Sequence, residues 1–276
     1  MSIGYFNGEF IPVDKAVIPI DERGHQFGDG VYEVIRVYNR KPFMLKEHIQ
    51  RLLSSASSIK LNVNKSLEDI EDIITKAIEN TDMFDFDIYF QMTRGIATRK
   101  HLFPDTPVSI SMTVRPMKVM EDTVRKMGVN AILHEDERWL NCHIKSLNLL
   151  PNILAKQTAH ESGCYEAILI RNGFVTEGTS SNVYIIIDKK IYTTPLSKQI
   201  LPGITRAAVK KIASLLQIDF IEKHITSTEL LQADEVFITS TTNEILPIVN
   251  VDGTKINDGY SGELSLALYE KFKQFI

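Results

Sequence analysis

One lysine in this sequence is well placed for covalent or acid–base chemistry. Lys145 follows an apolar-edged run that resembles the end of a strand, and a helical pattern begins directly after it. A lysine at such a junction keeps its stem among apolar groups and its amine at a cleft. Loss of water there favours the neutral amine, which is a nucleophile or a base. Because most lysines are solvated surface charges, Lys145 becomes a candidate only together with other suitable groups.

Glu177 is the first of these groups. It lies in a polar stretch, Val175–Val183, that is rich in threonine and serine. A glutamate in a turn is usually just a solvated charge. If it is buried against a heteroaromatic nitrogen, its carboxylate holds a proton on that ring and strengthens an electron sink. The local pattern does not decide between these two interpretations.

Two further segments have donors suited to a phosphate. Pro202–Arg206 begins a predicted helix, where free backbone N–H groups, the positive helix end and the Thr205 hydroxyl favour an anion. The run Thr239–Asn243 supplies more hydroxyl and amide donors. Many helices begin in this way without a ligand, and the second run can equally be a plain polar loop.

A basic pair, Arg99 and His101, lies in a polar loop after a predicted strand. An arginine binds both oxygens of a carboxylate, and a nearby histidine or tyrosine can complete the contact. Tyr32, after a glycine-rich turn, could place its hydroxyl at a cleft. That turn is not a dinucleotide loop, because Glu33 stands at the third glycine position and a strand follows instead of a helix. The alternatives are a solvated loop and an ordinary strand tyrosine.

Composition excludes several classes of function. The 276 residues are 43% hydrophobic and 24% charged, which is ordinary for a globular protein. A net charge of −4 gives no electrostatic footprint for nucleic acid or an anionic membrane. The longest apolar runs are too short to span a bilayer, and the first residues lack signal-peptide order. The two cysteines indicate reduced thiols, so we expect a cytoplasmic protein. No histidine has metal-ligand spacing, and we assign no metal.

Hydrophobic periodicity predicts an α+β protein with two domains and mixed sheets. Apolar positions alternate in the predicted strands and step by three and four in the predicted helices. The expected strands are two within Ile3–Ile20, then Val31–Tyr38, Phe86–Met92, Val108–Val114, Val129–Leu133, Tyr165–Ile170, Asn182–Ile187, Lys190–Thr193, Phe220–His224 and Glu235–Thr239. The expected helices are Leu45–Ile59, Ser66–Ile78, one from about Asn148, Gly203–Leu216, one capped by Thr226 and Glu229, and Ser261–Ile276.

The expected domain boundary lies where a proline ends a strand and a charged stretch without periodicity follows. We therefore predict a smaller N-terminal domain over 1–118, a linker over 119–127 and a larger C-terminal domain over 128–276. The glycine-rich stretch Asp21–Gly30 is expected to form no regular element.

Taken together, these segments resemble the fold type IV pyridoxal-phosphate enzymes of the class IV aminotransferase family, and most closely the bacterial D-amino acid aminotransferase branch. The resemblance runs through nearly the whole chain. The matching segments are Asp21–Val34, Glu47–Leu52, Tyr89–Gly95, Ile144–Leu150, Val175–Gly178, Gly203–Arg206 and Ser240–Glu244. Ordered motifs of this length are highly specific and outweigh the local alternatives. Two departures are His25, where close relatives carry Tyr, and His143, where they carry Asp.

The resemblance implies a role for each candidate residue. Lys145 holds pyridoxal 5′-phosphate covalently and later moves a proton between the substrate Cα and the cofactor. Glu177 pairs with the pyridine nitrogen, and Leu201 packs on the ring. The phosphate-binding positions are Arg51, Ile204, Thr205, Ser240 and Thr241. The substrate-binding positions are Tyr32, Val34, Arg99, His101 and Thr242. With the lysine on one face of the cofactor, the side on which the carboxylate is anchored decides which enantiomer reacts.

The implied activity is transamination between D-amino acids and 2-oxo acids, typically D-alanine and 2-oxoglutarate giving pyruvate and D-glutamate. In this branch the arginine and histidine come from the partner subunit, so the resemblance implies a homodimer with shared active sites. The alternatives on the same scaffold are a branched-chain L-amino acid aminotransferase and an aminodeoxychorismate lyase. Arg99 and His101 argue against both, because those branches resemble this one at Lys145 and Glu177 but not at the basic pair.

Overall fold

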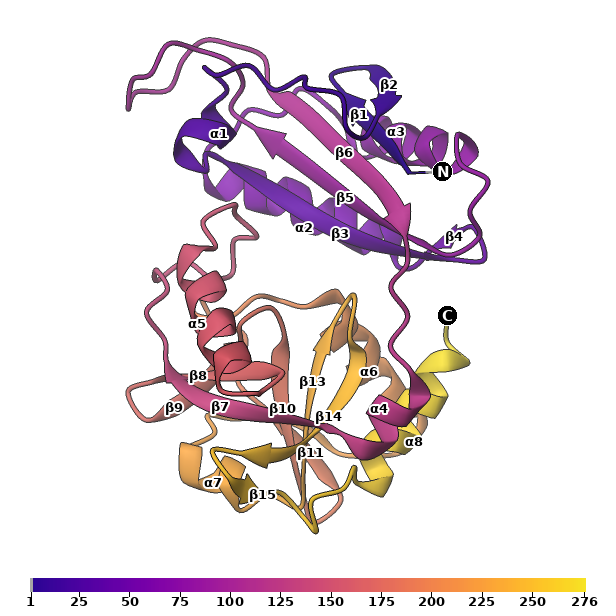
Figure 1. Ribbon diagram of the computed structural model, residues 1–276, viewed down its shortest axis with the longest axis vertical. Coiled ribbons are helices and arrows are strands. Elements are labelled where there is room, and N and C mark those ends of the chain that lie inside the picture. The colour runs from indigo at the N-terminus through magenta and orange to yellow at the C-terminus, as the bar shows by residue number, and fades with distance from the viewer. Residues whose placement is uncertain (1) are drawn as a thin grey trace. The chain divides into compact units, whose positions relative to one another are not determined.

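Figure 1 shows the computed structural model of the chain, which describes residues 2–276. The chain forms two compact units. Unit 1 comprises the residues up to Lys118 together with Ile144–Asn148, and unit 2 comprises Val119–His143 and Leu149–Ile276. The segment with the candidate lysine thus belongs to unit 1, although the residues on both sides of it belong to unit 2.

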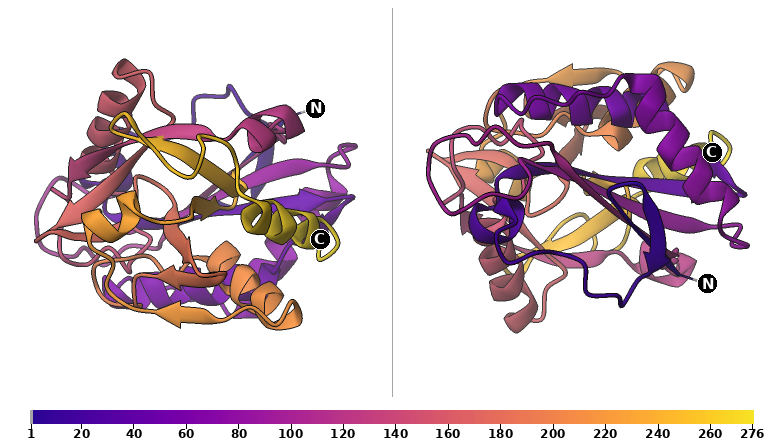
Figure 2. Two further views of the ribbon diagram at one scale, coloured as in Figure 1. Left: turned by 90° about the horizontal axis from the view of Figure 1, so that it is seen from below. Right: turned by 90° about the horizontal axis from the view of Figure 1, so that it is seen from above.

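Unit 1 is built on one antiparallel sheet with the strand order β2-β1-β6-β5-β3-β4. Its strands are β1 (Ile3–Phe6), β2 (Glu9–Pro12), β3 (Gly30–Tyr38), β4 (Lys41–Pro42), β5 (Phe86–Thr93) and β6 (Ser109–Pro116). Its helices are α1 (Arg23–Phe27), α2 (Leu45–Ser58) and α3 (Leu67–Glu79). Figure 2 shows α2 and α3 on the same face of this sheet.

The core of unit 1 lies between that sheet face and the two helices. On β3, Val31, Ile35 and Val37 are buried with Glu33 between them, because alternate strand residues point to the same face. From α2, Ile49 and its apolar neighbours cover them. An acid on a core face must be paired, and this requirement shapes one part of the candidate site described below.

Unit 2 holds a mixed sheet with the order β12-β11-β10-β13-β14-β7-β8-β9, and β15 pairs with β14. The pairs β11–β12, β14–β7 and β7–β8 are parallel. The strands are β7 (Val129–Glu135), β8 (Glu166–Arg171), β9 (Phe174–Gly178), β10 (Asn182–Ile187), β11 (Lys190–Thr193), β12 (Phe220–Glu222), β13 (Glu235–Ser240), β14 (Glu244–Val251) and β15 (Thr254–Lys255). The helices are α4 (Asp122–Met127), α5 (Leu150–Glu161), α6 (Ile204–Leu215), α7 (Ser227–Leu231) and α8 (Glu263–Lys273).

The α+β class is confirmed, and several details differ from expectation. Only unit 2 has a mixed sheet. The stretch Asp21–Gly30 was expected to be irregular but contains α1, because the Glu22 side chain accepts the His25 N–H and Gly28 ends the helix in the left-handed region (φ 64°). The expected linker 119–127 contains α4. Strands β9 and β14 were not predicted.

Within residues 2–276, no helix combines the length and apolar character needed to cross a membrane. The same residues contain no group of three or more His, Cys, Asp or Glu side chains arranged to hold a metal ion.

Candidate active site

The segment of Lys145 is fixed in unit 1 by main-chain bonds rather than by a strand of its own. The N–H of Tyr32 donates to the Lys145 carbonyl at 3.0 Å, and the N–H of Leu147 donates to Gly30 O at 3.1 Å. The Lys145 N–H donates to Ser55 Oγ of α2 at 3.1 Å. The expectation that Lys145 lies at a strand end is therefore wrong: the lysine is on irregular chain held between β3 and α2.

The amine of Lys145 lies over the ring of Tyr32, with Nζ 4.3 Å from the ring centroid. Tyr32 in turn stacks on Tyr89 of β5 at 5.5 Å between centroids. The structure thus brings together two of the predicted site residues. Val34 lies two residues beyond Tyr32 on β3 and so shares its face of the sheet.

Arg51, a predicted phosphate-binding residue, forms a two-pronged ion pair with Glu33. Its Nε and Nη2 donate to the two carboxylate oxygens of Glu33, each at 2.7 Å, and Nδ1 of His48 lies 2.7 Å from Oε2 of the same acid. Burial favours a higher pKa for Glu33, but the Arg51 charge and the hydrogen bonds from both neighbours lower it to about 2. Burial is also the main reason why the pKa of His48 is lowered. Sequence reasoning missed Glu33 and His48, although the position of Glu33 on a core face was a usable signal.

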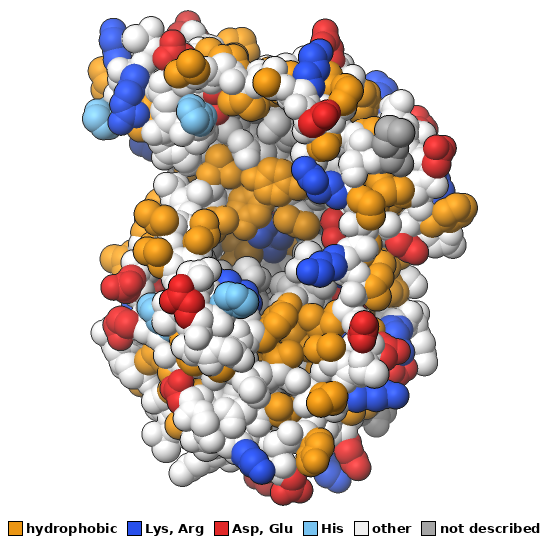
Figure 3. Space-filling view, viewed as in Figure 1, with side chains coloured by type: hydrophobic (Ala, Val, Ile, Leu, Met, Phe, Trp, Pro, Cys, Tyr) orange, Lys and Arg blue, Asp and Glu red, His pale blue; other side chains and the backbone are white. Residues whose placement is uncertain are grey.

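Arg99 and His101 lie together on an exposed loop between β5 and β6, and both contact the same ring. The Arg99 guanidinium is 4.1 Å from the Phe27 ring centroid, and the His101 ring is 5.7 Å from it. Arg99 also donates to Gln26 O at 3.3 Å. Figure 3 shows basic and histidine side chains gathered over this loop and α1. The contacts of the pair run to α1, not to Tyr32 or Lys145.

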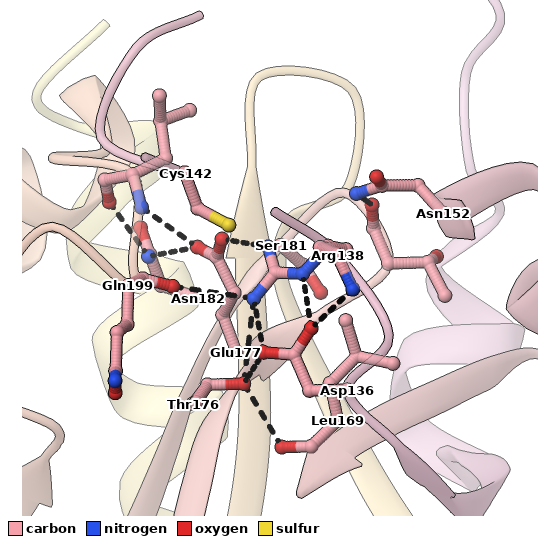
Figure 4. A network of polar contacts seen from close by, with 12 residues as sticks. Asp136, Arg138, Cys142, Asn152, Leu169, Thr176, Glu177, Ser181, Asn182 and Gln199 are labelled. Carbon is pink, nitrogen blue, oxygen red and sulfur yellow. Dashed lines mark hydrogen bonds and ion pairs between the residues drawn. The ribbon is translucent and has the colours of Figure 1, made fainter. Parts of the chain in front are cut away.

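Glu177 lies in unit 2 on β9, where it is buried instead of solvated in a turn. Arg138 Nη1 donates to its Oε1, while Leu201 N–H (3.0 Å) and Asn182 Nδ2 (3.3 Å) donate to Oε2. Figure 4 shows this network from close by. Burial raises the pKa of the Glu177 carboxyl, and the Arg138 guanidinium opposes that rise.

Arg138 is itself held by a second acid. Its Nε and Nη2 donate to the two oxygens of Asp136, both at 2.8 Å, and Thr176 Oγ1 donates to Asp136 at 2.8 Å (Figure 4). Burial acts to raise the pKa of Asp136, but Arg138 holds it below its ordinary value. The arginine therefore carries a fixed charge beside Glu177. Asp136 and Arg138 were not predicted as functional residues, and no spacing rule links them to Glu177.

Asn182 connects Glu177 with the predicted phosphate-binding helix. Its Nδ2 also donates to Leu201 O at 3.0 Å. A Cβ on Gly203 would meet Asn182 Oδ1 at 2.1 Å, so only glycine allows this close approach. Gly203 caps α6 without a side-chain hydrogen bond. The first N–H groups of α6 therefore have no intrahelical acceptor, as at any helix N-terminus, and the buried residues Ile204 and Thr205 follow.

The hydroxyl-rich run lies at the same end of the sheet as Asn182, because Asn182 pairs with Thr239 across β10 and β13. Ser240 ends β13, and the loop Thr241–Asn243 leads into β14. Ser240 Oγ accepts the N–H of Asn243 at 3.0 Å and lies 3.4 Å from Thr242 Oγ1. Unit 2 thus gathers Glu177, the start of α6 and these hydroxyls at one end of its sheet.

The chemistry of these groups fits one another: an amine able to attack a carbonyl, a buried acid, and a helix N-terminus near hydroxyl donors. Comparison with known proteins gives the same answer. A family model described as amino-transferase class IV matches residues 30–251. The chain is 43% identical to a D-alanine aminotransferase of Staphylococcus aureus (strain N315) over 99% of this chain and 97% of that protein. It is 45% identical to the D-alanine aminotransferase of Bacillus licheniformis over 94% and 92% of the two chains.

Solved structures give the same fold. The branched-chain amino acid aminotransferase of Escherichia coli matches with a TM-score of 0.92 and 26% identity, over 99% of this chain and 93% of that one. A second branched-chain amino acid aminotransferase, from T.th. and solved with pyridoxamine 5′-phosphate, matches with a TM-score of 0.91, 26% identity and the same coverage. With a family model that spans most of its length and relatives of this identity, the chain belongs to the class IV aminotransferases.

Proposed function

We propose that the protein is a pyridoxal-phosphate-dependent transaminase that moves an amino group between D-amino acids and 2-oxo acids, with D-alanine and 2-oxoglutarate as the typical pair. The observation that carries this proposal is the identity of 43% to a D-alanine aminotransferase over 99% of the chain. When bound, pyridoxal phosphate withdraws electrons from the substrate and makes its Cα–H bond acidic.

The side chains present fit this cofactor. Lys145 supplies an amine for its aldehyde, and buried Glu177 supplies an acid for its pyridine nitrogen. The free N–H groups at the start of α6, with Thr205, Ser240 and Thr241, supply donors for its phosphate. The close approach of Gly203 to Asn182 holds Leu201, the proposed ring-packing residue, to the same network as Glu177. Arg51 completes the proposed phosphate-binding set.

Each residue then has a defined task. Lys145 takes the proton from the substrate Cα and returns it at the adjacent cofactor carbon, as a general base and acid. Glu177 keeps the ring nitrogen protonated, and Arg138 favours the charged form of Glu177 in its buried position. Glu33 and His48 hold the Arg51 guanidinium in place. None of these tasks requires a metal ion.

We propose that Arg99 and His101, with Tyr32, Val34 and Thr242, bind the substrate's α-carboxylate and set the D preference. We further propose a homodimer in which the basic pair completes the partner's site. Two observations support this arrangement: the pair contacts Phe27 rather than Tyr32 within its own unit, and Leu102 and Phe103 beside it are 82% and 58% exposed. Exposed apolar residues of this size commonly mark an interface.

We also propose that the enzyme works in the cytoplasm, which agrees with the two free cysteines, Cys142 and Cys164. The test of the function is a coupled assay on cofactor-loaded protein with D- and L-alanine as donors and 2-oxoglutarate as acceptor. We expect turnover of D-alanine alone. Turnover of L-leucine or L-valine without D-alanine would favour a branched-chain L-amino acid aminotransferase, the activity of the solved structures with this fold. Pyruvate formation from aminodeoxychorismate alone would favour a lyase.

A further inference from the structure

The loop that carries the proposed phosphate hydroxyls has an unusual residue at its end. Strands β13 and β14 pair in register with Ser240 opposite Glu244, so three residues, Thr241–Asn243, form the hairpin loop. Hairpin loops of this length commonly close with a left-handed residue, for which glycine is preferred. Here that position is Glu244, with φ at 56°. A side chain at this position strains the backbone in a way that glycine would avoid.

Arg125 of α4 binds on both sides of this strained residue. Its Nη2 donates to Glu244 Oε2 at 2.7 Å, and its Nη1 donates to the carbonyls of Asn243 (2.6 Å) and Ile245 (2.5 Å). The guanidinium is buried and lies 4.2 Å from the Tyr269 ring centroid. One side chain thus fixes three consecutive residues. We call Arg125 and Glu244 the hairpin clasp.

A second contact extends this order to Ser240. The Tyr165 hydroxyl donates to Asn243 Oδ1 at 2.6 Å, and the Asn243 N–H donates to Ser240 Oγ at 3.0 Å. Because the Ser240 oxygen accepts this bond, its own proton is available for donation. The clasp therefore acts on Asn243, and Asn243 acts on the Ser240 hydroxyl.

We propose that Arg125 and Glu244 are positioning residues that hold the Ser240–Thr242 hydroxyls in the geometry required to bind the cofactor's phosphate. This inference rests on the proposed function of that loop. The pair contributes through geometry rather than net charge, because the two side chains neutralise each other. A glutamate is kept at a position suited to glycine because its carboxylate anchors Arg125.

The test compares two ligands that differ only in the phosphate. The full-length protein, freed of cofactor, is titrated with pyridoxal 5′-phosphate and with pyridoxal, and binding is followed by absorbance. For Arg125→Met we expect the dissociation constant of pyridoxal 5′-phosphate to rise about tenfold or more, as for loss of an outer partner of a ligand-binding group. The dissociation constant of pyridoxal should stay the same. Equal weakening of both ligands, or of neither, would overturn the proposal.

Two variants of Glu244 keep the test decisive if Arg125→Met does not fold. Glu244→Gln preserves the size of the side chain but removes its charge, and it should give the same phosphate-selective loss. Glu244→Gly relieves the strained backbone and also releases Arg125, so it should weaken phosphate binding although the backbone gains freedom. Tighter binding of pyridoxal 5′-phosphate in Glu244→Gly would show that strain relief outweighs the clasp and would contradict the proposal.

Two controls separate this inference from the proposed function. Arg36→Met removes another buried arginine–carboxylate pair, with Asp87 at 2.8 Å, and should leave the ratio of the two dissociation constants unchanged. The double variant Ser240→Ala, Thr241→Ala removes the hydroxyls themselves. If it weakens phosphate binding while Arg125→Met does not, only the clasp is wrong. If it has no effect, the phosphate role of the loop is wrong.

Discussion

Arg138 donates a hydrogen bond from Nη1 to Oε1 of Glu177 inside unit 2, and Asp136 holds the same guanidinium from its other side. Burial raises the pKa of Glu177, and Arg138 is the main group that opposes the rise. The charge state of the acid therefore depends on this arginine.

Arg138→Met should raise the pKa of Glu177 further, because burial then acts without its counter-charge. The neutral acid no longer favours a protonated ring, so kcat should fall about tenfold or more near neutral pH, within the usual range for a lost acid–base contribution. The acidic limb of the kcat profile should move to higher pH. Arg138→Lys, which keeps the charge, should retain more activity. A pH profile of Arg138→Met that overlays the parent would exclude this role.

Lys145→Ala should abolish transamination while the protein still binds phosphate-bearing cofactor. A missing general base typically costs about 10²- to 10⁴-fold in rate, and here the covalent attachment is lost as well. Borohydride reduction of the parent protein followed by peptide mapping should find the cofactor on the peptide that contains Lys145. An adduct on any other peptide, or turnover close to the parent's in the variant, would remove Lys145 from the mechanism.

Local patterns predicted most elements of both units. The capping boxes illustrate this: Ser66 with Asp69 begins α3, and Thr226 with Glu229 begins α7. Each consists of a few neighbouring residues, so the signal is complete in the sequence. The strand Asn182–Ile187 was placed at its observed bounds, because a run of buried apolar residues marks it.

The errors arise where distant residues decide the structure. The local pattern around Glu177 indicates a turn, because its partner Arg138 lies 39 positions away and only burial next to it makes a strand acid tolerable. The pattern around Lys145 indicates a strand end, yet its main-chain partner is the N–H of Tyr32. Arg125 lies in the expected linker, and its partners lie beyond residue 240. No short-range pattern contains such pairs.

Arg99→Ala should weaken the contact with the substrate's α-carboxylate. A hydrogen bond between charged groups contributes about 1.5–3 kcal/mol, so KM for D-alanine should rise about ten- to hundredfold. The variant should fold normally, because Arg99 is exposed and makes one hydrogen bond, to Gln26, at 3.3 Å. Lys100→Ala, next to it in the same loop, is the matched control. An unchanged KM in Arg99→Ala would place the carboxylate elsewhere.

The pairing of Glu33 with Arg51 and His48 predicts how stability depends on pH. The folded pKa of Glu33 is about 2, below its ordinary value of 4.5, so its contribution is fully present above about 4.5 and is lost as pH falls toward 2. Removing the acid also leaves Arg51 without this carboxylate, so Glu33→Gln should lose a few kcal/mol of unfolding free energy at pH 7, on the order expected for breaking a buried pair.

Urea unfolding at a series of pH values tests this prediction. The pKa of His48 is also lowered, so protonation of that ring in the unfolded chain starts to reduce stability near its ordinary pKa of 6.5. The comparison is therefore made between about pH 5 and about pH 2.5, where the stability of the parent should fall more steeply than that of Glu33→Gln. If both proteins lost stability in parallel over this range, Glu33 would not be the group that titrates.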